Sequence, residues 1–171
     1  MTTMNALQQW KRCPDFIDVD DEHRSIRLLK RGDCYALKGR FPEQRAGEVE
    51  MRLPGEDISI LRGNPPSDPL PGVELLPVYA TSDNTPPAVA TGRLFLRLRD
   101  DIAIESVRGD IDTLGFDIDA TPAYAPHSAW LRPKSGRVVD ALSKLESLRA
   151  LPGAARVEPQ LLRPMSRKKT L

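Results

Sequence analysis

Few side chains in this sequence of 171 residues have the type and spacing that catalysis or metal binding requires. His23 and His127 stand alone, without the neighbouring partner that a general base needs. Cys13 and Cys34 are 21 positions apart, which is not the spacing of a zinc site. The sequence contains no phosphate-binding glycine loop, no nucleophile motif and no cofactor fingerprint. We therefore expect no enzyme activity, no catalytic residue, no metal and no cofactor.

Three acidic pairs could in principle hold a divalent cation: Asp20–Asp21, Asp100–Asp101, and Asp117 with Asp119. A simpler interpretation of Asp100 and Asp101 is a helix N-cap, because an aspartate oxygen accepts hydrogen bonds from the free N–H groups of a first turn. Asp117 and Asp119 alternate with apolar residues, so we expect them on the solvent face of a strand. Two cysteines are too few for a disulfide framework, and we expect reduced thiols that pack as small apolar groups.

Composition argues against several classes of protein. Lys plus Arg number 25 and Asp plus Glu number 24, so the formal net charge of +1 gives no sign of a general polyanion binder. No segment approaches the roughly 18–20 apolar residues that cross a bilayer. The first residues also lack the basic and apolar regions of a secretory signal. We therefore expect a cytoplasmic protein with no membrane partner, and we do not expect nucleic acid as its main partner.

A proline-rich stretch divides the chain into two parts. Residues 64–91 contain seven of the 16 prolines, and a turn-forming segment within them places the boundary near residue 88. The first 90 residues carry 11 basic and 14 acidic side chains, whereas the remainder carries 14 and 10. We expect a small β-rich domain of unknown role at 1–88 and a second domain at 91–171.

Short segments in the first part alternate between apolar and polar residues, as half-buried strands do. The predicted strands lie at 16–20, 25–29, 34–41, 48–53, 57–61 and 73–79. Gly, Pro and Asp between these segments are typical of the turns in a small antiparallel β domain.

The second part begins with a strand at 92–99, which has Leu94, Leu96 and Leu98 on one face and arginines and Phe95 on the other. A helix should follow and end at Gly115, a residue that suits positive φ. Its apolar stripe consists of Ile104, Val107, Ile111 and Leu114.

Strands at 116–120 and 128–132 are expected next, followed by a second helix that Ser135 caps and Pro152-Gly153 stops. The apolar stripe of this helix consists of Val138, Leu142, Leu145 and Leu148. A last strand at 155–159 completes the order β-α-β-β-α-β, which is the ferredoxin-like arrangement. The predicted fold class is therefore α+β, with this module preceded by the β-rich domain.

This series of elements resembles the N-terminal propeptide of subtilisin-like serine proteases, the peptidase inhibitor I9 family. The resemblance covers residues 91–165 and leaves the first 90 residues uncovered. It rests on the first strand, the glycine after the first helix, the leucines of the second helix and a late Val-Glu-Pro: Leu94, Leu96, Leu98, Gly115, Leu142, Leu145, Leu148 and Val157-Glu158-Pro159.

Propeptides of that family act as folding chaperones and inhibitors, with the sheet packed on two surface helices of the protease and the tail extended through the active cleft. The resemblance implies a partner-facing sheet that contains Arg93, Phe95, Arg97 and Trp130. It implies a cleft-binding tail that consists of Gln160, Leu161, Leu162, Arg163, Pro164, Met165 and Ser166. Pro164 suits such a tail, because proline cannot lie inside a helix and biases the residue before it toward an extended backbone.

The sequence departs from the family in one respect, because the Asp-, His- and Ser-centred motifs of the protease itself are absent. We therefore expect a stand-alone propeptide-like chaperone or inhibitor that acts on a separately encoded subtilisin-like protease. One alternative is an interaction or scaffold protein built on the ferredoxin-like module. Another is RNA binding through the arginines and aromatic rings of the sheet face.

Overall fold

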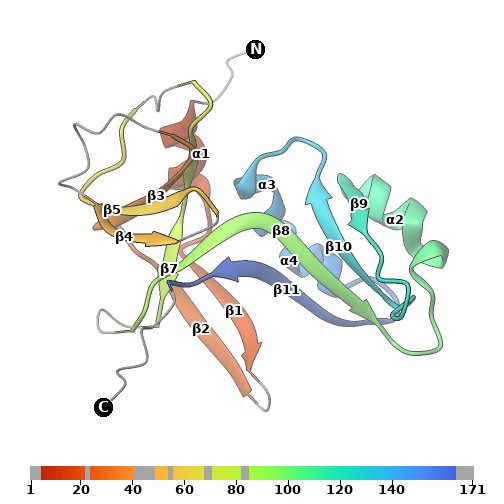
Figure 1. The fold of residues 1–171 in the computed structure, drawn as a ribbon. Coiled ribbons are helices and arrows are strands. Elements are labelled where there is room, and N and C mark those ends of the chain that lie inside the picture. Colours follow the sequence, from red (N-terminus) through yellow and green to blue (C-terminus); the bar gives the residue numbers. More distant parts are fainter. Residues whose placement is uncertain are drawn as a thin grey trace. The chain divides into compact units, whose positions relative to one another are not determined.

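A computed structural model describes residues 5–21, 24–40, 49–53, 56–67, 71–81 and 85–164. His23 and the predicted tail residues Met165 and Ser166 lie outside the described residues. The fold belongs to the α+β class, with many strands and a few short helices (Figure 1). This class is the one that the sequence predicts.

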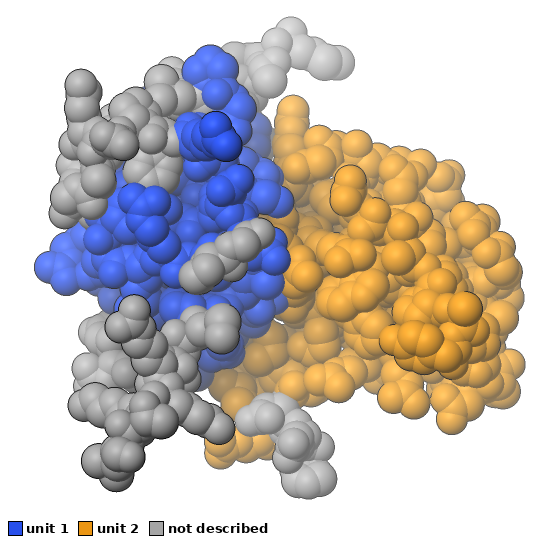
Figure 2. All heavy atoms as spheres, viewed as in Figure 1, with its two compact units in different colours: residues 1–16, 28–89, 161–171 blue, residues 17–27, 90–160 orange. Residues whose placement is uncertain are grey.

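Contacts within the chain divide it into two compact units (Figure 2). Unit 1 comprises residues 1–16, 28–89 and 161–171, and unit 2 comprises residues 17–27 and 90–160. The passage from unit 1 to unit 2 after residue 89 lies close to the predicted boundary near 88. The membership of residues 17–27 in unit 2 has no signal in the sequence. Whether residues 1–88 fold as a domain of their own stays a prediction.

Unit 1 contains a four-stranded antiparallel sheet with the strand order β4-β5-β3-β6. The strands are β3 (Cys34–Lys38), β4 (Val49–Leu53), β5 (Ile58–Arg62) and β6 (Glu74–Leu76). All four coincide with predicted strands, so the alternation of apolar and polar residues located them correctly.

The predicted strand at 73–79 is divided in the structure at Pro77. β6 ends before this proline, and β7 (Val78–Ala80) begins after it and pairs with other strands. β7 pairs with the end of β2 (Arg24–Lys30), where Leu29 lies opposite Ala80, and with the start of β8 (Ala88–Leu98), where Val78 lies opposite Val89. Proline has no N–H to donate to a strand ladder, which makes it a natural point for this change of partner.

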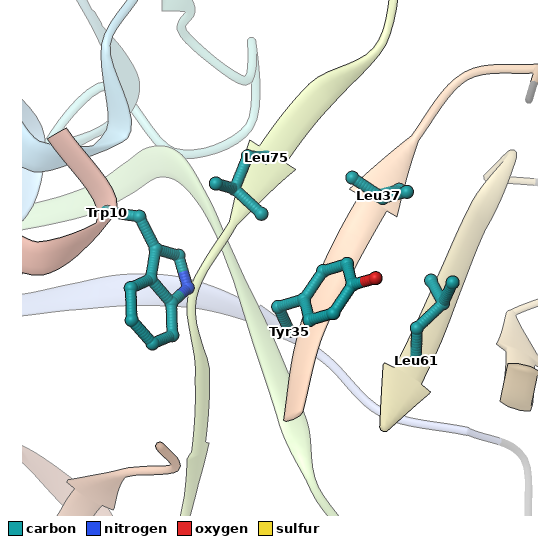
Figure 3. Close-up of a cluster of buried hydrophobic side chains, with 5 residues drawn as sticks. All are labelled: Trp10, Tyr35, Leu37, Leu61 and Leu75. Atoms are coloured by element: carbon teal, nitrogen blue, oxygen red, sulfur yellow. The ribbon is translucent and has the colours of Figure 1, made fainter. Parts of the chain in front are cut away.

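The helix α1 (Ala6–Arg12) contributes Trp10 to the hydrophobic cluster of unit 1 (Figure 3). The other members are Tyr35, Leu37, Leu61 and Leu75. The sequence does not predict this helix, because seven residues are too few to show a helical period. A capping box marks its start, in which the Asn5 side chain accepts from the Gln8 N–H and the Gln8 side chain accepts from the Asn5 N–H.

The Lys30 ammonium group holds the chain that leaves the C-terminus of α1. Lys30 Nζ donates to the backbone oxygens of Trp10, Lys11 and Cys13 at 3.4, 3.2 and 2.9 Å. It also lies 5.1 Å from the centre of the Trp10 ring. A cation at this position is favourable, because the last carbonyl groups of a helix lack partners within the helix and carry partial negative charge.

Unit 2 contains the four strands of the predicted C-terminal module, with the order β11-β8-β10-β9. After β8, these are β9 (Phe116–Ala120), β10 (Ser128–Pro133) and β11 (Ala154–Leu162). The β8–β10 and β10–β9 pairs are antiparallel. The predicted strands are therefore confirmed, and both β8 and β11 extend further than the sequence pattern indicated.

Both predicted helices of unit 2 are present, but each is interrupted. The first consists of a 3-10 turn, η2 (Ile104–Val107), and α2 (Arg108–Thr113), and the second consists of α3 (Val138–Leu142) and α4 (Leu145–Arg149). The predicted stripes point into the core, with every member buried except Leu114, which is half-buried. Gly115 has a φ of 92° where the first helix ends, as its position predicted.

The two predicted N-caps are wrong. Asp100 and Asp101 precede η2 by too many residues, and the capping position is Ala103, which makes no side-chain bond. Their carboxylates pair instead with Arg97 and Arg99. The cap of α3 is Arg137, and Ser135 lies two residues earlier, where its hydroxyl accepts from the Arg137 N–H and donates to the Asp140 carboxylate.

We expect Lys30→Met to lower the free energy of unfolding by about 1–3 kcal/mol, because three carbonyl groups lose a charged donor in a largely buried setting. Urea denaturation measures this change. Lys11→Met is the matched control, since Lys11 is exposed on the same helix and should cost only a few tenths of a kcal/mol. Equal effects of the two substitutions would contradict the role given to Lys30.

Candidate partner-binding face

The side chains of β8 define the two faces of the unit 2 sheet. Its burial alternates along the strand, and Leu94, Leu96 and Leu98 are fully buried. The side chains that alternate with them, which include Arg93, Phe95 and Arg97, point to the opposite face and are half-buried or exposed. The helices pack on the leucine side: a Cβ added to Gly92, on the same face as the leucines, would lie 3.2 Å from the Cα of Val138 in α3. The other side is the candidate site, which we call the open face.

An aromatic pair lies at the centre of the open face. Phe95 of β8 is directly opposite Trp130 of β10, and their ring centres are 5.1 Å apart at an interplanar angle of 58°. The Arg93 guanidinium lies over the Trp130 ring, 4.6 Å from its centre. Such tilted ring pairs and cation–π contacts are each attractive, so the three side chains hold one another in place.

A bulge in β9 brings an acidic side chain to this group. In the register, Trp130 lies opposite Ala120 and Leu131 lies opposite Ile118, so Asp119 is the extra residue. Its carboxylate reaches Arg93 Nε at 2.9 Å and Arg132 Nη2 at 3.4 Å. Bulges commonly re-aim a side chain, and here the bulge places one carboxylate between two guanidinium groups on neighbouring strands.

Asp117, the other member of the pair that the sequence places on this strand, also has a cationic partner. Asp117 and Asp112 both contact Lys134 Nζ, at 3.1 and 2.6 Å. Within the described ranges, no group of three or more His, Cys, Asp or Glu side chains could hold a metal ion. Asp117 and Asp119, which the sequence predicts on the solvent face of a strand, thus form ion pairs with lysine and arginine side chains.

The predicted cleft-binding tail begins inside the sheet. Gln160, Leu161 and Leu162 are the last residues of β11 and are half-buried, and the Gln160 side chain accepts from the Thr91 hydroxyl at 2.8 Å. Arg163 and Pro164 follow without regular structure. Arg93, Phe95, Arg97 and Trp130 share the open face, and the partner-facing role of this face stays a prediction. Gln160, Leu161 and Leu162 belong to the edge strand β11.

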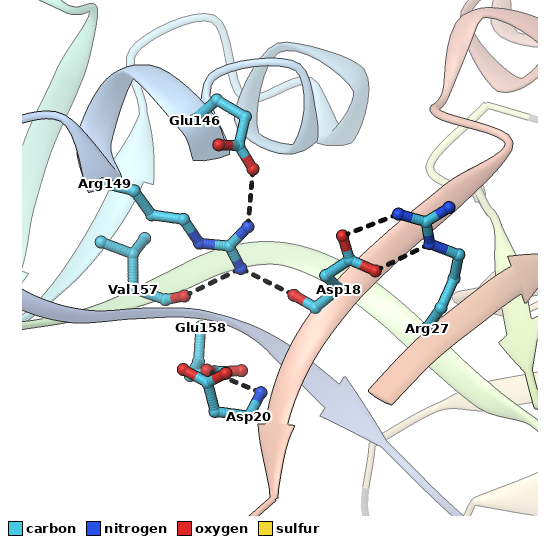
Figure 4. A network of polar contacts seen from close by, with 7 residues as sticks. All are labelled: Asp18, Asp20, Arg27, Glu146, Arg149, Val157 and Glu158. Atoms are coloured by element: carbon cyan, nitrogen blue, oxygen red, sulfur yellow. Dashed lines mark hydrogen bonds and ion pairs between the residues drawn. The ribbon is translucent and has the colours of Figure 1, made fainter. Parts of the chain in front are cut away.

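A polar network that has no signal in the sequence joins the hairpin of β1 (Phe16–Asp21) to β11 within unit 2 (Figure 4). Arg149 Nη2 donates to the backbone oxygens of Asp18 and Val157 at 2.7 and 3.2 Å, and Arg149 Nη1 pairs with Glu146 at 2.8 Å. The contact between Arg149 and Asp18 joins residues 131 positions apart, so no local sequence pattern predicts it.

The Glu158 carboxylate continues this network. It accepts from the Asp20 N–H at 3.1 Å and lies 3.5 Å from Arg156 Nε, while Arg156 also donates to the Asp20 carbonyl. Burial raises the pKa of Glu158, against the lowering influence of the Asp20 N–H and Arg156. The Asp18 carbonyl and the Asp20 N–H and carbonyl of β1 are thus satisfied by side chains of α4 and β11.

The two cysteines are buried, and the described histidine, His127, contacts the backbone. Burial raises the pKa of Cys13 to about 12 and that of Cys34 to about 11, which keeps both thiols protonated near neutral pH. Nδ1 of His127 lies 3.0 Å from the Ile102 carbonyl oxygen. The two buried thiols fit the packing role that the sequence favours.

Comparisons with known protein families, with curated proteins and with solved structures found no match for this chain. In the part of the chain that the structure describes, no helix is long and apolar enough to cross a membrane.

We expect Glu158→Gln to raise the free energy of unfolding at pH 7. A carboxyl whose pKa is higher in the folded than in the unfolded protein favours folding when protonated, and its ionisation at higher pH lowers stability. The glutamine keeps an oxygen for the Asp20 N–H and carries no charge. The gain should disappear well below pH 4.5, where the carboxyl is protonated in both states.

Urea denaturation at several pH values measures this difference. Glu146→Gln is the control, because it removes an exposed carboxylate beside Arg149 and should bring no gain. A Glu158→Gln protein that is less stable than the wild type at pH 7 would show that the ion pair with Arg156 outweighs the cost of burial.

Proposed function

We propose that unit 2 is a ferredoxin-like module that binds a separately encoded subtilisin-like serine protease in the cytoplasm, as an inhibitor, a folding chaperone or both. The strand order supports this assignment. In the order β11-β8-β10-β9, the first and third strands of a β-α-β-β-α-β series are adjacent at the centre, which is the order that two right-handed crossovers produce.

The observation that carries the proposal is the aromatic pair on the open face. Phe95 and Trp130 are large apolar side chains on the side of the sheet away from the helices, and both are only partly buried. Aromatic side chains and arginine are the residue types that contribute most to protein–protein interfaces. A face with such residues at its centre supports a partner-binding role for the sheet.

The end of β11 suits the proposed binding of the C-terminal tail in the active cleft of the protease. The chain leaves the sheet after Leu162 and continues through Arg163 and Pro164, and proline favours an extended backbone before it. An extended segment adds backbone hydrogen bonds to a sheet edge of its partner while alternate side chains enter pockets. We therefore assign the cleft-binding role to the residues from Arg163 onward, with β11 fixing their starting point.

Inhibition of purified subtilisin-like proteases tests the proposal, with the full chain and with a chain that ends at Leu162. We expect the full chain to inhibit at least one such protease and the shortened chain to inhibit it at least about tenfold more weakly, because it keeps β11 but lacks the tail. Phe95→Ala should also weaken inhibition by removing the centre of the docking face.

Tyr124→Ala is the matched control. Tyr124 is an exposed aromatic residue of unit 2 in the loop between β9 and β10, and its loss should leave inhibition unchanged. Full inhibition by the shortened chain would remove the tail from the mechanism. A lack of inhibition in every case would overturn the proposed function and favour a scaffold protein.

A further inference from the structure

We infer that the seam between β1 and β11 is a binding site for an extended peptide strand of another protein. The seam is the strip between the facing edges of these two strands within unit 2. Side chains of α4 and β11 fill the place of the missing strand. The inference does not depend on the proposed function, which uses the open face and the chain after Leu162.

The facing edges of β1 and β11 do not pair with each other. β1 ends the strand order beside β2, whereas β11 pairs with β8. The backbone groups that point into the seam belong to Asp18 and Asp20 of β1 and to Val157 of β11 (Figure 4). Pro159, two residues further along β11, has no N–H, which suits the free edge of a sheet. Each strand thus presents an edge that another strand could extend.

Arg149 takes the place of a backbone donor between the two strands. The carbonyl oxygens of Asp18 and Val157 both accept from Arg149 Nη2, at 2.7 and 3.2 Å. Two carbonyl groups cannot bond to each other, so a donor must lie between them. The N–H groups of an inserted strand point alternately to its two neighbours, and they can therefore serve both carbonyl groups.

Two further side chains complete the pattern along β1. The Asp20 N–H donates to the Glu158 carboxylate at 3.1 Å, and the Asp20 carbonyl accepts from Arg156 at 3.2 Å. Together with Arg149, these groups offer β1 a donor, an acceptor and a donor in turn. The backbone edge of a paired strand offers the same alternation.

The side chains in the seam have access to solvent. Arg149 is 26% exposed and Arg156 is 48% exposed, and Arg149 has Glu146 as a second partner. Glu158 is only 14% exposed, and burial raises its pKa, so its carboxylate gains hydration when it leaves the seam. An incoming strand replaces the bonds that these groups make to the backbone, and their hydration offsets part of the cost of displacing them.

The neighbours of the seam define the kind of peptide that it fits. The buried neighbours are apolar, Ile17 on β1 and Val157 on β11, and the exposed neighbours are charged, Asp20 and Arg156. Because successive side chains of a strand face opposite sides, a bound strand should alternate between apolar and polar residues. Backbone hydrogen bonds supply the affinity of such a complex, and the alternate side chains supply its selectivity.

NMR titration of the isotope-labelled full chain tests the inference, with a peptide of alternating valine and threonine between terminal lysines. We expect saturable binding, with the largest shift changes at the amide groups of Asp18, Asp20 and Val157. The matched control peptide has the same sequence with methyl groups on its valine nitrogens. It should bind at least about tenfold more weakly, because it keeps every side chain and loses backbone donors.

Arg149→Met should bind the unmethylated peptide at least about threefold more tightly, because the peptide no longer has to displace the guanidinium group. Arg108→Met is the control variant. Arg108 is an exposed arginine of α2 that pairs with Glu105, so its loss should leave the affinity unchanged.

The location of the shift changes separates this site from the other end of the sheet. Changes confined to β9, the last strand at that end, would place the peptide there and overturn the inference. A lack of binding, equal binding of the methylated peptide, or an affinity that does not rise in Arg149→Met would also overturn it.

Discussion

The alternation of side chains along β8 is the constraint on which the rest of unit 2 depends. Because successive residues of a strand face opposite sides, the full burial of Leu94, Leu96 and Leu98 under the helices forces Phe95 and its flanking arginines to the other side. A shift of one residue in register would bury those arginines and expose the leucines. The core and the open face are therefore determined by the same register, and neither can change without the other.

Trp130 and Asp119 show how the neighbouring strands adapt to that register. Trp130 lies opposite Phe95 because β10 buries Ala129 and Leu131 on the same side as the leucines of β8. Asp119 reaches the arginines through the β9 bulge. At the other edge of the sheet, Arg149 and Glu158 satisfy the backbone of the N-terminal hairpin, so residues 17–27 stay with unit 2. There, side chains rather than a neighbouring strand make the hydrogen bonds to the backbone of β1.

Much of the fold can be predicted from local patterns, because alternation and helical stripes reflect which side chains are buried. The strand at Leu94–Leu98 and the stripe from Val138 to Leu148 are clear for that reason. The helix at Ala6–Arg12 is too short for such a pattern. The capping roles of Asp100 and Ser135 were wrong, since a cap depends on the residue at which the first turn begins. The Arg149 network joins residues that are far apart in the sequence, so no local pattern predicts it.

The central claim is that the outward side of β8 meets a protein partner. A photoreactive phenylalanine analogue in place of Phe95 tests it most directly, with the same analogue in place of Met51 as the comparison, because Met51 is an exposed apolar residue of β4 in unit 1. We expect irradiation of the mixture with a subtilisin-like protease to link the two proteins from position 95 and not from position 51. Linkage from position 51 alone would contradict the claim.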